Sequence, residues 1–191
     1  MIIVSITYSL ILLISYCMRF MGVSYYGVVM LMGLVMTGLM AGLFFAWSCA
    51  ITAGLGRLPD AGYLAAMQSI NRTILNPLFF SCFFGTAVVL PVAAWLAYTP
   101  ALPVRFWLLL GAAACYGVGV MGVTVFGNVP LNEALDAFSL EHASADAMHT
   151  QRMAFEVRWN ALNTVRAWAA TGALVLLGLA LLQRSADADA V

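Results

Sequence analysis

Four long apolar runs dominate the pattern of hydrophobic and polar positions along this chain. They cover residues 27–52, 77–98, 104–126 and 160–182. Each run is long enough to cross the hydrocarbon core of a bilayer, which takes about 20 residues of helix. None shows the alternation of a barrel strand, and lipid otherwise allows only helices to satisfy the backbone hydrogen bonds. The pattern therefore predicts an all-α, polytopic transmembrane four-helix bundle.

The connections between the runs differ in length. The second, "TPALP", allows only a tight turn, so the helices on either side of it are expected to be antiparallel neighbours. The first, at about 53–76, and the third, at about 127–159, are longer and lie on one side of the membrane. Asp60 is a candidate N-cap in the first, and Pro130 suits the first turn of a helix in the third. We expect short amphipathic helices in both.

The first 26 residues form another apolar segment, which contains no alanine and lacks the positive start of a secretory signal. Residues 1–26 are either a fifth hydrophobic helix or an extension from a mis-assigned start codon. The expected division of the chain is this extension, a four-helix transmembrane domain at 27–183 and a polar tail at 184–191.

Composition agrees with a membrane protein whose main partner is the lipid bilayer. The chain is 64% hydrophobic and 8% charged, with a mean hydropathy of +0.98, against about 45–50% apolar residues in soluble domains. Eight basic residues balance eight acidic ones, so the charge gives no reason to expect a nucleic-acid partner. All eight basic residues are arginine, which with the abundant alanine is typical of a GC-rich bacterial genome. We expect a multi-pass protein of the bacterial cytoplasmic membrane.

The sequence offers little to bind a metal or cofactor. The cysteines lie singly in separate apolar segments, at Cys17, Cys49, Cys82 and Cys115. The two histidines, His142 and His149, have no carboxylate–histidine motif around them. Nucleophile elbows, phosphate loops and dinucleotide fingerprints are also missing. No metal site and no cofactor are expected.

A polar stripe lies in "RMAFEVRWNALNTVRAW" at residues 152–168, on a helix expected to begin near Ser144 and to continue unbroken to the fourth run. One face of this helix, about 120° wide, carries six polar side chains and a tryptophan. They are His149, Arg152, Glu156, Trp159, Asn160, Asn163 and Arg166. Polar groups near hydrocarbon usually face the bundle interior and are paired. The stripe is therefore either a structural hydrogen-bond lattice or one wall of a site.

Further polar residues approach the same end of the bundle. They are Gln68, Asn71, Arg72 and Asn76 in the first connection, and Asn128 and Asn132 after the third run. Buried amides need hydrogen-bond partners. Asn76 and Asn128 are equally well explained as helix caps, so the set describes either a pocket or a lattice.

Four stretches carry a family resemblance, in order, over about residues 30–182. They are "GLMAGLFFAWS", "YLAAMQSINRTILNPLF", "FGNVPLNEAL" and "RWNALNTVRAWAA". Together they resemble the anthrone oxygenase-like family of small integral membrane proteins, many of whose bacterial members are known as a domain of unknown function. In the fungal members, an anthrone methylene is oxidised with dioxygen to an anthraquinone, and no flavin, haem or metal is established for that reaction.

The resemblance implies a lipophilic aromatic substrate, dioxygen, and roles for particular residues. Glu156 or His149 would be the catalytic base that removes a proton from the substrate. The groups that hold the substrate oxygens would include Asn128, Asn132, Asn163 and Arg166, with Asn71 and Arg72 in the same binding set. The rings of Trp159 and of Phe44 or Phe45 would stack on the substrate.

Two other interpretations stay open. The chain could be a non-catalytic accessory or small-molecule-binding membrane protein whose polar stripe holds helices together or contacts a partner. A quinone- or haem-binding redox protein is a third interpretation, which the poor supply of ligands disfavours.

Overall fold

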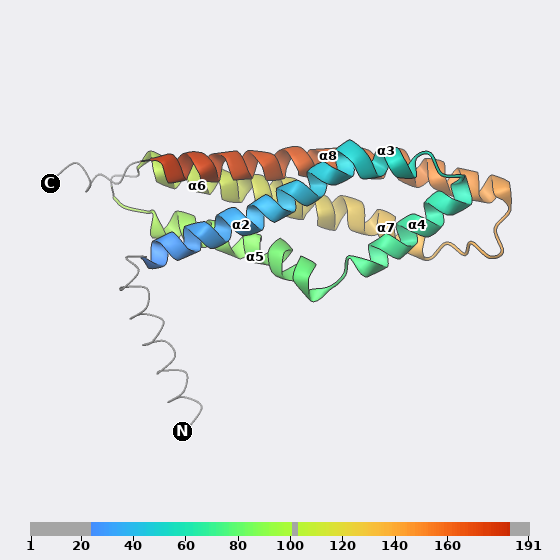
Figure 1. Cartoon of the computed structure of the whole chain (residues 1–191), viewed down its shortest axis with the longest axis horizontal. Helices are drawn as coiled ribbons and strands as arrows, with labels where there is room; N and C mark the ends of the chain where they lie inside the picture. The colour runs from blue at the N-terminus through green and yellow to red at the C-terminus, as the bar shows by residue number, and fades with distance from the viewer. Residues whose placement is uncertain (1–23, 101–102, 184–191) are drawn as a thin grey trace, which may run out of the picture.

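A computed structural model describes residues 24–100 and 103–183. All the regular secondary structure in this part of the chain is helical. Four helices are long and apolar enough to span a membrane: Tyr25–Leu55, Pro77–Leu96, Val104–Asp136 and Ala145–Leu182. They lie side by side in one elongated bundle (Figure 1). The all-α class and the four spans are thereby confirmed. The segment at 1–23 and the tail at 184–191 lie outside the described residues.

Several elements join end to end within the spans. In chain order they are α2 (Tyr25–Ala46), the π-helical η1 (Trp47–Ile51), α3 (Thr52–Leu55), α4 (Asp60–Thr73), α5 (Pro77–Leu96), α6 (Val104–Ala114), the π-helical η2 (Cys115–Gly122) and η3 (Thr124–Asn128), α7 (Val129–Asp136) and α8 (Ala145–Leu182). The first span contains α2, η1 and α3, and the third contains α6, η2, η3 and α7. Both expected connection helices exist, but α7 continues the third span directly.

Local sequence signals explain where the helices begin. The Ser144 hydroxyl accepts a hydrogen bond from the Ala147 backbone N–H at 3.2 Å, so α8 begins where the sequence predicts. Asn76 caps α5 in the same way, accepting from the Phe79 N–H at 3.0 Å. The sequence predicts Asp60 as the N-cap of α4, and this prediction is wrong. Pro59 is the N-cap, and Asp60 is the first residue of the helix. Its carboxylate is free to bond elsewhere.

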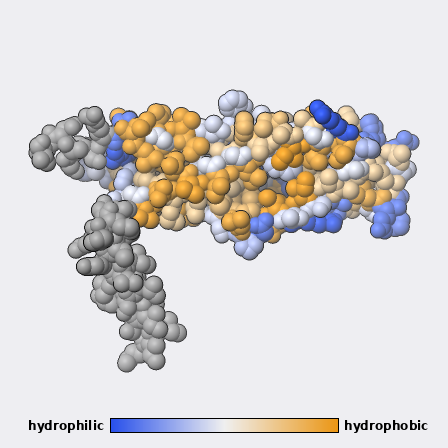
Figure 2. Space-filling model, in the orientation of Figure 1, coloured by the Kyte–Doolittle hydropathy of each residue, from blue (hydrophilic) through white to orange (hydrophobic). Residues whose placement is uncertain are grey.

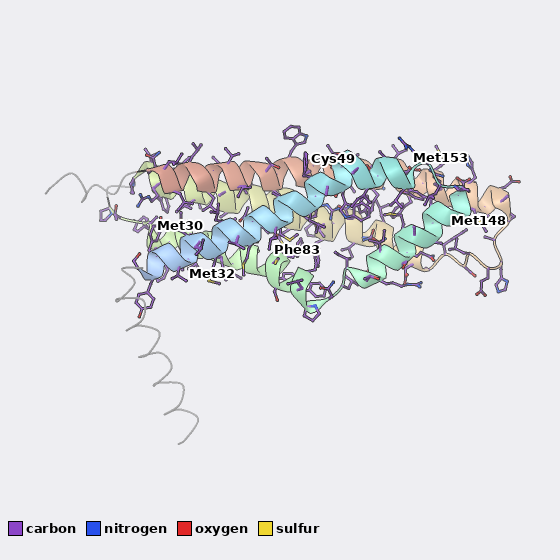
Figure 3. All side chains as sticks on the ribbon, viewed as in Figure 1. Met30, Met32, Cys49, Phe83, Met148 and Met153 are labelled. Carbon is purple, nitrogen blue, oxygen red and sulfur yellow. The ribbon has the colours of Figure 1, made fainter. Side chains whose placement is uncertain are left out.

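The bundle has two hydrophobic cores. The longer one lies among α2, α5, α6, η2 and α8 and includes the buried side chains of Met30, Leu90, Leu109, Tyr116 and Leu177. The second lies at the opposite end, under α4 and α7, and consists of Trp47, Tyr63, Leu64, Met67, Leu135, Phe155 and Trp159. Figure 3 places Met30 near the start of α2 and Met148 at the far end of the bundle.

The two ends of the molecule differ in surface character. Figure 2 shows hydrophobic surface along most of the bundle, with hydrophilic residues gathered toward the end formed by α3, α4 and α7. At that end an ion-pair cluster of Asp60, His149, Arg152 and Glu156 joins α4 to α8. Arg152 donates to Asp60 at 3.0 Å and to Glu156 at 2.6 Å, and His149 Nδ1 lies 3.0 Å from Asp60. The cluster holds α4 over the interior of the bundle.

The same arginine also binds the backbone of the connection between α3 and α4. Arg152 Nη1 donates to the Leu58 carbonyl at 2.8 Å, and Arg152 Nη2 donates to the Gly56 carbonyl at 2.9 Å. One side chain of α8 therefore fixes both the end of the first span and the start of α4. This arrangement sets the position of α4 relative to the cavity described below.

Replacing Asp60 by asparagine is expected to destabilise the protein at neutral pH but not in acid. Hydrogen bonds with His149 and Arg152 hold the pKa of Asp60 below its ordinary value of 3.8. A carboxylate with a lowered pKa adds stability above its unfolded-state pKa, and that stability is lost as the pH falls through the folded-state pKa. Urea unfolding of micelle-bound protein, followed by tryptophan fluorescence, should show a wild-type advantage at pH 7 that disappears well below pH 3.8.

Glu141 is an exposed carboxylate outside the ion-pair cluster, so Glu141→Gln is the matched control. It should leave the difference in stability between neutral and acid pH as it is in the wild type. An Asp60→Asn effect of equal size at both pH values would show that the carboxylate charge does not stabilise the fold.

Candidate functional site

Two adjoining cavities lie where the two cores meet. The inner cavity has a volume of about 90 Å³ and is walled by rings and aliphatic side chains of α2, η1, α4, α5 and α8. Its polar lining consists of Asn71, Thr124, Asn128, Asn132, Asn163 and Arg166. The outer cavity, of about 380 Å³, lies between α4 and α7. Asn71, Leu75, Val129 and Asn132 line both cavities, which makes them neighbouring parts of one recess.

Arg166 is a buried cation without an anionic partner among the described residues. Its side chain comes from α8, and the residue is 7% exposed. None of the ion pairs within 4.0 Å that join described residues includes it. An uncompensated charge at such a position costs several kcal/mol in typical estimates. The fold therefore maintains a positive charge at the inner cavity at a cost to stability.

Neutral groups hold the guanidinium in place. Nη2 of Arg166 donates to Asn163 Oδ1 at 3.0 Å, and Nη1 reaches Thr124 Oγ1 at 3.4 Å. The guanidinium carbon lies 4.7 Å from the centre of the Phe44 ring and 5.3 Å from that of Trp159. Aromatic faces attract cations, but they do not neutralise the charge. The Nε atom of Arg166 is buried and has no hydrogen-bond partner.

Asn163 orients Arg166 through its side-chain amide, whose nitrogen and oxygen both form hydrogen bonds. Its Nδ2 donates to the Phe44 carbonyl at 3.2 Å and to Ser48 Oγ at 2.9 Å, while its Oδ1 accepts from Arg166. The two donor bonds fix which way the amide points. Asn163 therefore fastens α8 to α2 and η1, and presents an oxygen to the arginine.

Two further amides at the inner cavity are buried without partners. Asn128 is 1% exposed, and both its Nδ2 and its Oδ1 lack a hydrogen bond. It makes no cap hydrogen bond either, which removes the helix-cap explanation and contrasts with Asn76. The Nδ2 of Asn71 is likewise buried and unpaired. Each such group costs about 1–3 kcal/mol, so these three atoms at one cavity offer hydrogen bonds to a ligand or to ordered water with both acceptor and donor atoms.

π-Helical turns bring several of these side chains to the cavity. Trp47 and Ser48 belong to η1, and Thr124 and Asn128 belong to η3. A π turn contains an extra residue, which shifts the direction of the side chains that follow, and such turns occur frequently at functional sites. The third span could not present Asn128 to the interior in the same register if it were a regular α-helix throughout.

Aromatic rings and one ion pair complete the recess. The ring centres of Trp47 and Trp159 are 5.0 Å apart, and Trp159 Nε1 donates to Asn132 Oδ1 at 2.8 Å. In the outer cavity, Arg72 Nε lies 2.5 Å from Asp136 Oδ1. This pair links α4 to α7 across the outer cavity and neutralises both of its members.

The structure brings together most of the residues predicted to bind substrate. Those that line the inner cavity are Phe44, Asn71, Asn128, Asn132, Trp159, Asn163 and Arg166, and Arg72 lines the outer one. Phe45 is 61% exposed and faces a separate groove with Cys49 and Trp168. The two predicted bases, Glu156 and His149, line neither cavity, because both belong to the ion-pair cluster.

Sequence reasoning missed Thr124, Glu133 and Asp136, which line the recess, and Ser48, which accepts a hydrogen bond from Asn163. A signal for two of them exists, because Ser48 follows Phe44 by four positions and Thr124 precedes Asn128 by four. Glu133 is next to Asn132 within "NVPLNEAL". For metals, the described residues contain no group of three or more His, Cys, Asp or Glu placed to share one ion.

Comparison with known proteins gives one family. The family model described as "Anthrone oxygenase" matches residues 79–176, slightly more than half of the chain. The matched region begins in α5 and ends in α8, so it includes Thr124, Asn128, Asn132, Asn163 and Arg166. No curated protein and no solved structure matches the chain.

Proposed function

The chain belongs to the anthrone oxygenase family, and from that premise we propose that it is an integral membrane oxidoreductase of the bacterial cytoplasmic membrane. Its substrate is a lipophilic aromatic carbon acid of the anthrone type, bound as an anion and oxidised by dioxygen. The observation that supports this proposal best is the buried Arg166, which lacks a carboxylate partner within the described residues. The lysine-free, arginine-only composition supports the bacterial assignment.

The dimensions of the recess suit such a substrate. Small-molecule sites typically have volumes of about 300–1,000 Å³, so the inner cavity of about 90 Å³ is too small alone, whereas the outer cavity of about 380 Å³ is not. A tricyclic molecule would place one oxygen at Arg166 and extend its rings past Asn132 into the outer cavity. Leu75 and Val129, which line both cavities, are 62% and 38% exposed and provide an apolar rim for a molecule that arrives from the bilayer.

The chemistry follows from the charge at the inner cavity. When an anthrone loses a proton from its methylene carbon, the electron pair spreads over the rings onto the carbonyl oxygen and forms a phenolate. Arg166 and the Asn128 amide stabilise that oxyanion, because preorganised donors in a buried site cost little reorganisation during the reaction. The anion is electron-rich enough to react with dioxygen and form a hydroperoxide at the methylene carbon. Loss of water then gives the ketone, so one oxygen atom enters the product and the other leaves as water.

Purified protein in lipid nanodiscs is expected to accelerate the conversion of anthrone to anthraquinone by at least about 100-fold over empty nanodiscs, the lower range for positioned acid–base catalysis. Oxygen uptake and anthraquinone formation should rise together, one dioxygen for each anthraquinone. An oxidation rate equal to that of empty nanodiscs would contradict the proposal. Tight anthrone binding without faster oxidation would instead identify a non-catalytic binding protein.

A further inference from the structure

We propose that Glu133 of α7 is the catalytic base that accepts the proton of the substrate. The inference rests on the proposed function, since it requires a carbon acid whose oxygen lies at Arg166. Glu133 lines the outer cavity, and the preceding residue, Asn132, lines both cavities. The side chain is exposed at the recess rather than packed into the protein.

Glu133 differs from the other carboxylate at the recess in having no hydrogen-bond or ion-pair partner among the described residues. Among the residues that line the inner and outer cavities, only Glu133 and Asp136 carry a carboxylate. Asp136 is paired with Arg72 at 2.5 Å. The Glu133 side chain makes no hydrogen bond and no ion pair within the described part of the chain. It is therefore the carboxylate at the recess whose lone pairs are available to a proton.

Two other carboxylates of this end, Glu156 and Asp60, are committed to the ion-pair cluster. Glu156 accepts from Arg152 at 2.6 Å, and Asp60 is shared by Arg152 and His149 at 3.0 Å each. Those bonds hold α4 to α8. Protonating either carboxylate would weaken that connection, whereas protonating Glu133 breaks no contact.

Arg166 and Glu133 are the charged residues of the recess without an ion-pair partner among the described residues, and they lie at its inner and outer cavities respectively. Arg166 lies at the inner cavity, with its guanidinium carbon 5.3 Å from the Trp159 ring centre. Trp159 donates to Asn132 at 2.8 Å and so fixes α7 beside it. A flat substrate with its oxygen at Arg166 would pass Asn132 and bring its opposite side to the outer cavity, where Glu133 lies. The cation then faces the oxygen that gains charge, and the carboxylate faces the carbon that loses a proton.

The step is a proton transfer and needs no oxidant. The methylene C–H bond breaks, and an O–H bond forms on a carboxylate oxygen of Glu133. The electron pair of the broken bond moves through the rings to the oxygen held by Arg166. Glu133, whose side chain is exposed, then releases its proton to water.

Hydrogen–deuterium exchange of the anthrone methylene under anaerobic conditions measures this step without any oxidation. Nanodiscs with wild-type protein in D₂O should exchange the methylene hydrogens faster than empty nanodiscs, as followed by mass spectrometry of the recovered anthrone. Glu133→Gln should lower that excess rate by about 100-fold or more, the usual contribution of a general base. Glu133→Asp, which keeps the carboxylate but shortens its reach, should retain an intermediate rate and a similar pH profile.

Glu141→Gln, an exposed carboxylate in the connection between α7 and α8, is the matched control and should exchange like wild type. Full exchange by Glu133→Gln, or no excess exchange by wild-type protein, would overturn the role of Glu133. If exchange were lost in Glu156→Gln and not in Glu133→Gln, the base would belong to the ion-pair cluster, and the role of Glu133 would be overturned. Exchange that depends on Glu133, without anthraquinone formation once oxygen is admitted, would refute the oxygenase proposal while leaving the base in place.

Discussion

Arg166→Gln is expected to lower the rate of anthrone oxidation by about 100- to 1,000-fold, the usual loss when one preorganised oxyanion donor is removed. The variant should nevertheless unfold no more easily than wild-type protein. The side chain is 7% exposed, and no carboxylate of the described residues lies within ion-pair distance. A buried charge without a partner costs several kcal/mol, and the neutral glutamine removes that cost. Oxidation in nanodiscs and urea unfolding of the same preparations measure the two quantities.

Arg158→Gln is the control for this experiment, because Arg158 lies on the same helix but is exposed and lines a groove on another side. It should change neither quantity. A large loss of stability in Arg166→Gln would show that the cation holds the bundle together rather than serving a ligand. Unchanged oxidation would remove the arginine from the site.

Gly119→Ala is expected to destabilise the bundle by about 1–3 kcal/mol, the usual range for overpacking. A Cβ atom at Gly119 would lie 2.4 Å from the Cβ of Ala169 on α8. The contact therefore requires η2 and α8 to move apart. The midpoint of urea unfolding in micelles measures the loss.

Two further variants test the cause of this loss. Gly117→Ala should be close to neutral, because a Cβ atom there would meet no atom within 4 Å. Adding Ala169→Gly to Gly119→Ala should restore most of the stability, since it removes the atom that the new methyl group meets. A Gly119→Ala variant as stable as wild type would mean that the two spans are packed less closely than the structure shows.

Periodicity predicted the four spans and one wall of the inner cavity. The stripe on α8 correctly grouped Trp159, Asn163 and Arg166, because residues on one helix face stay together when the helix packs. It could not show how far along the axis the cavity extends. Glu156 shares the stripe with Arg166 but lies ten residues earlier, about 15 Å along a helix that rises roughly 1.5 Å per residue. That distance places Glu156 in the ion-pair cluster instead of at the cavity.

The opposite wall depends on features that no helical period reveals. The π-helical η3 turns Asn128 inward, and a regular 3.6-residue repeat does not predict that direction. The sequence also does not show which of two adjacent aromatic residues faces the cavity. Phe44 is buried under Arg166, whereas Phe45 is exposed on another face. Asn76 and Asn128 were equally good caps by sequence, and only the hydrogen bonds separate them.

The central claim is that the inner cavity binds its ligand as an anion through Arg166. Anaerobic absorbance titration of anthrone in nanodiscs, which follows the appearance of the coloured anion with pH, tests it most directly. With wild-type protein, bound anthrone should ionise at least about one pH unit lower than in empty nanodiscs, which corresponds to 1.36 kcal/mol of preference for the anion. With Arg166→Gln, this shift should be lost. An ionisation pH that is the same in wild-type, variant and empty nanodiscs would contradict the account.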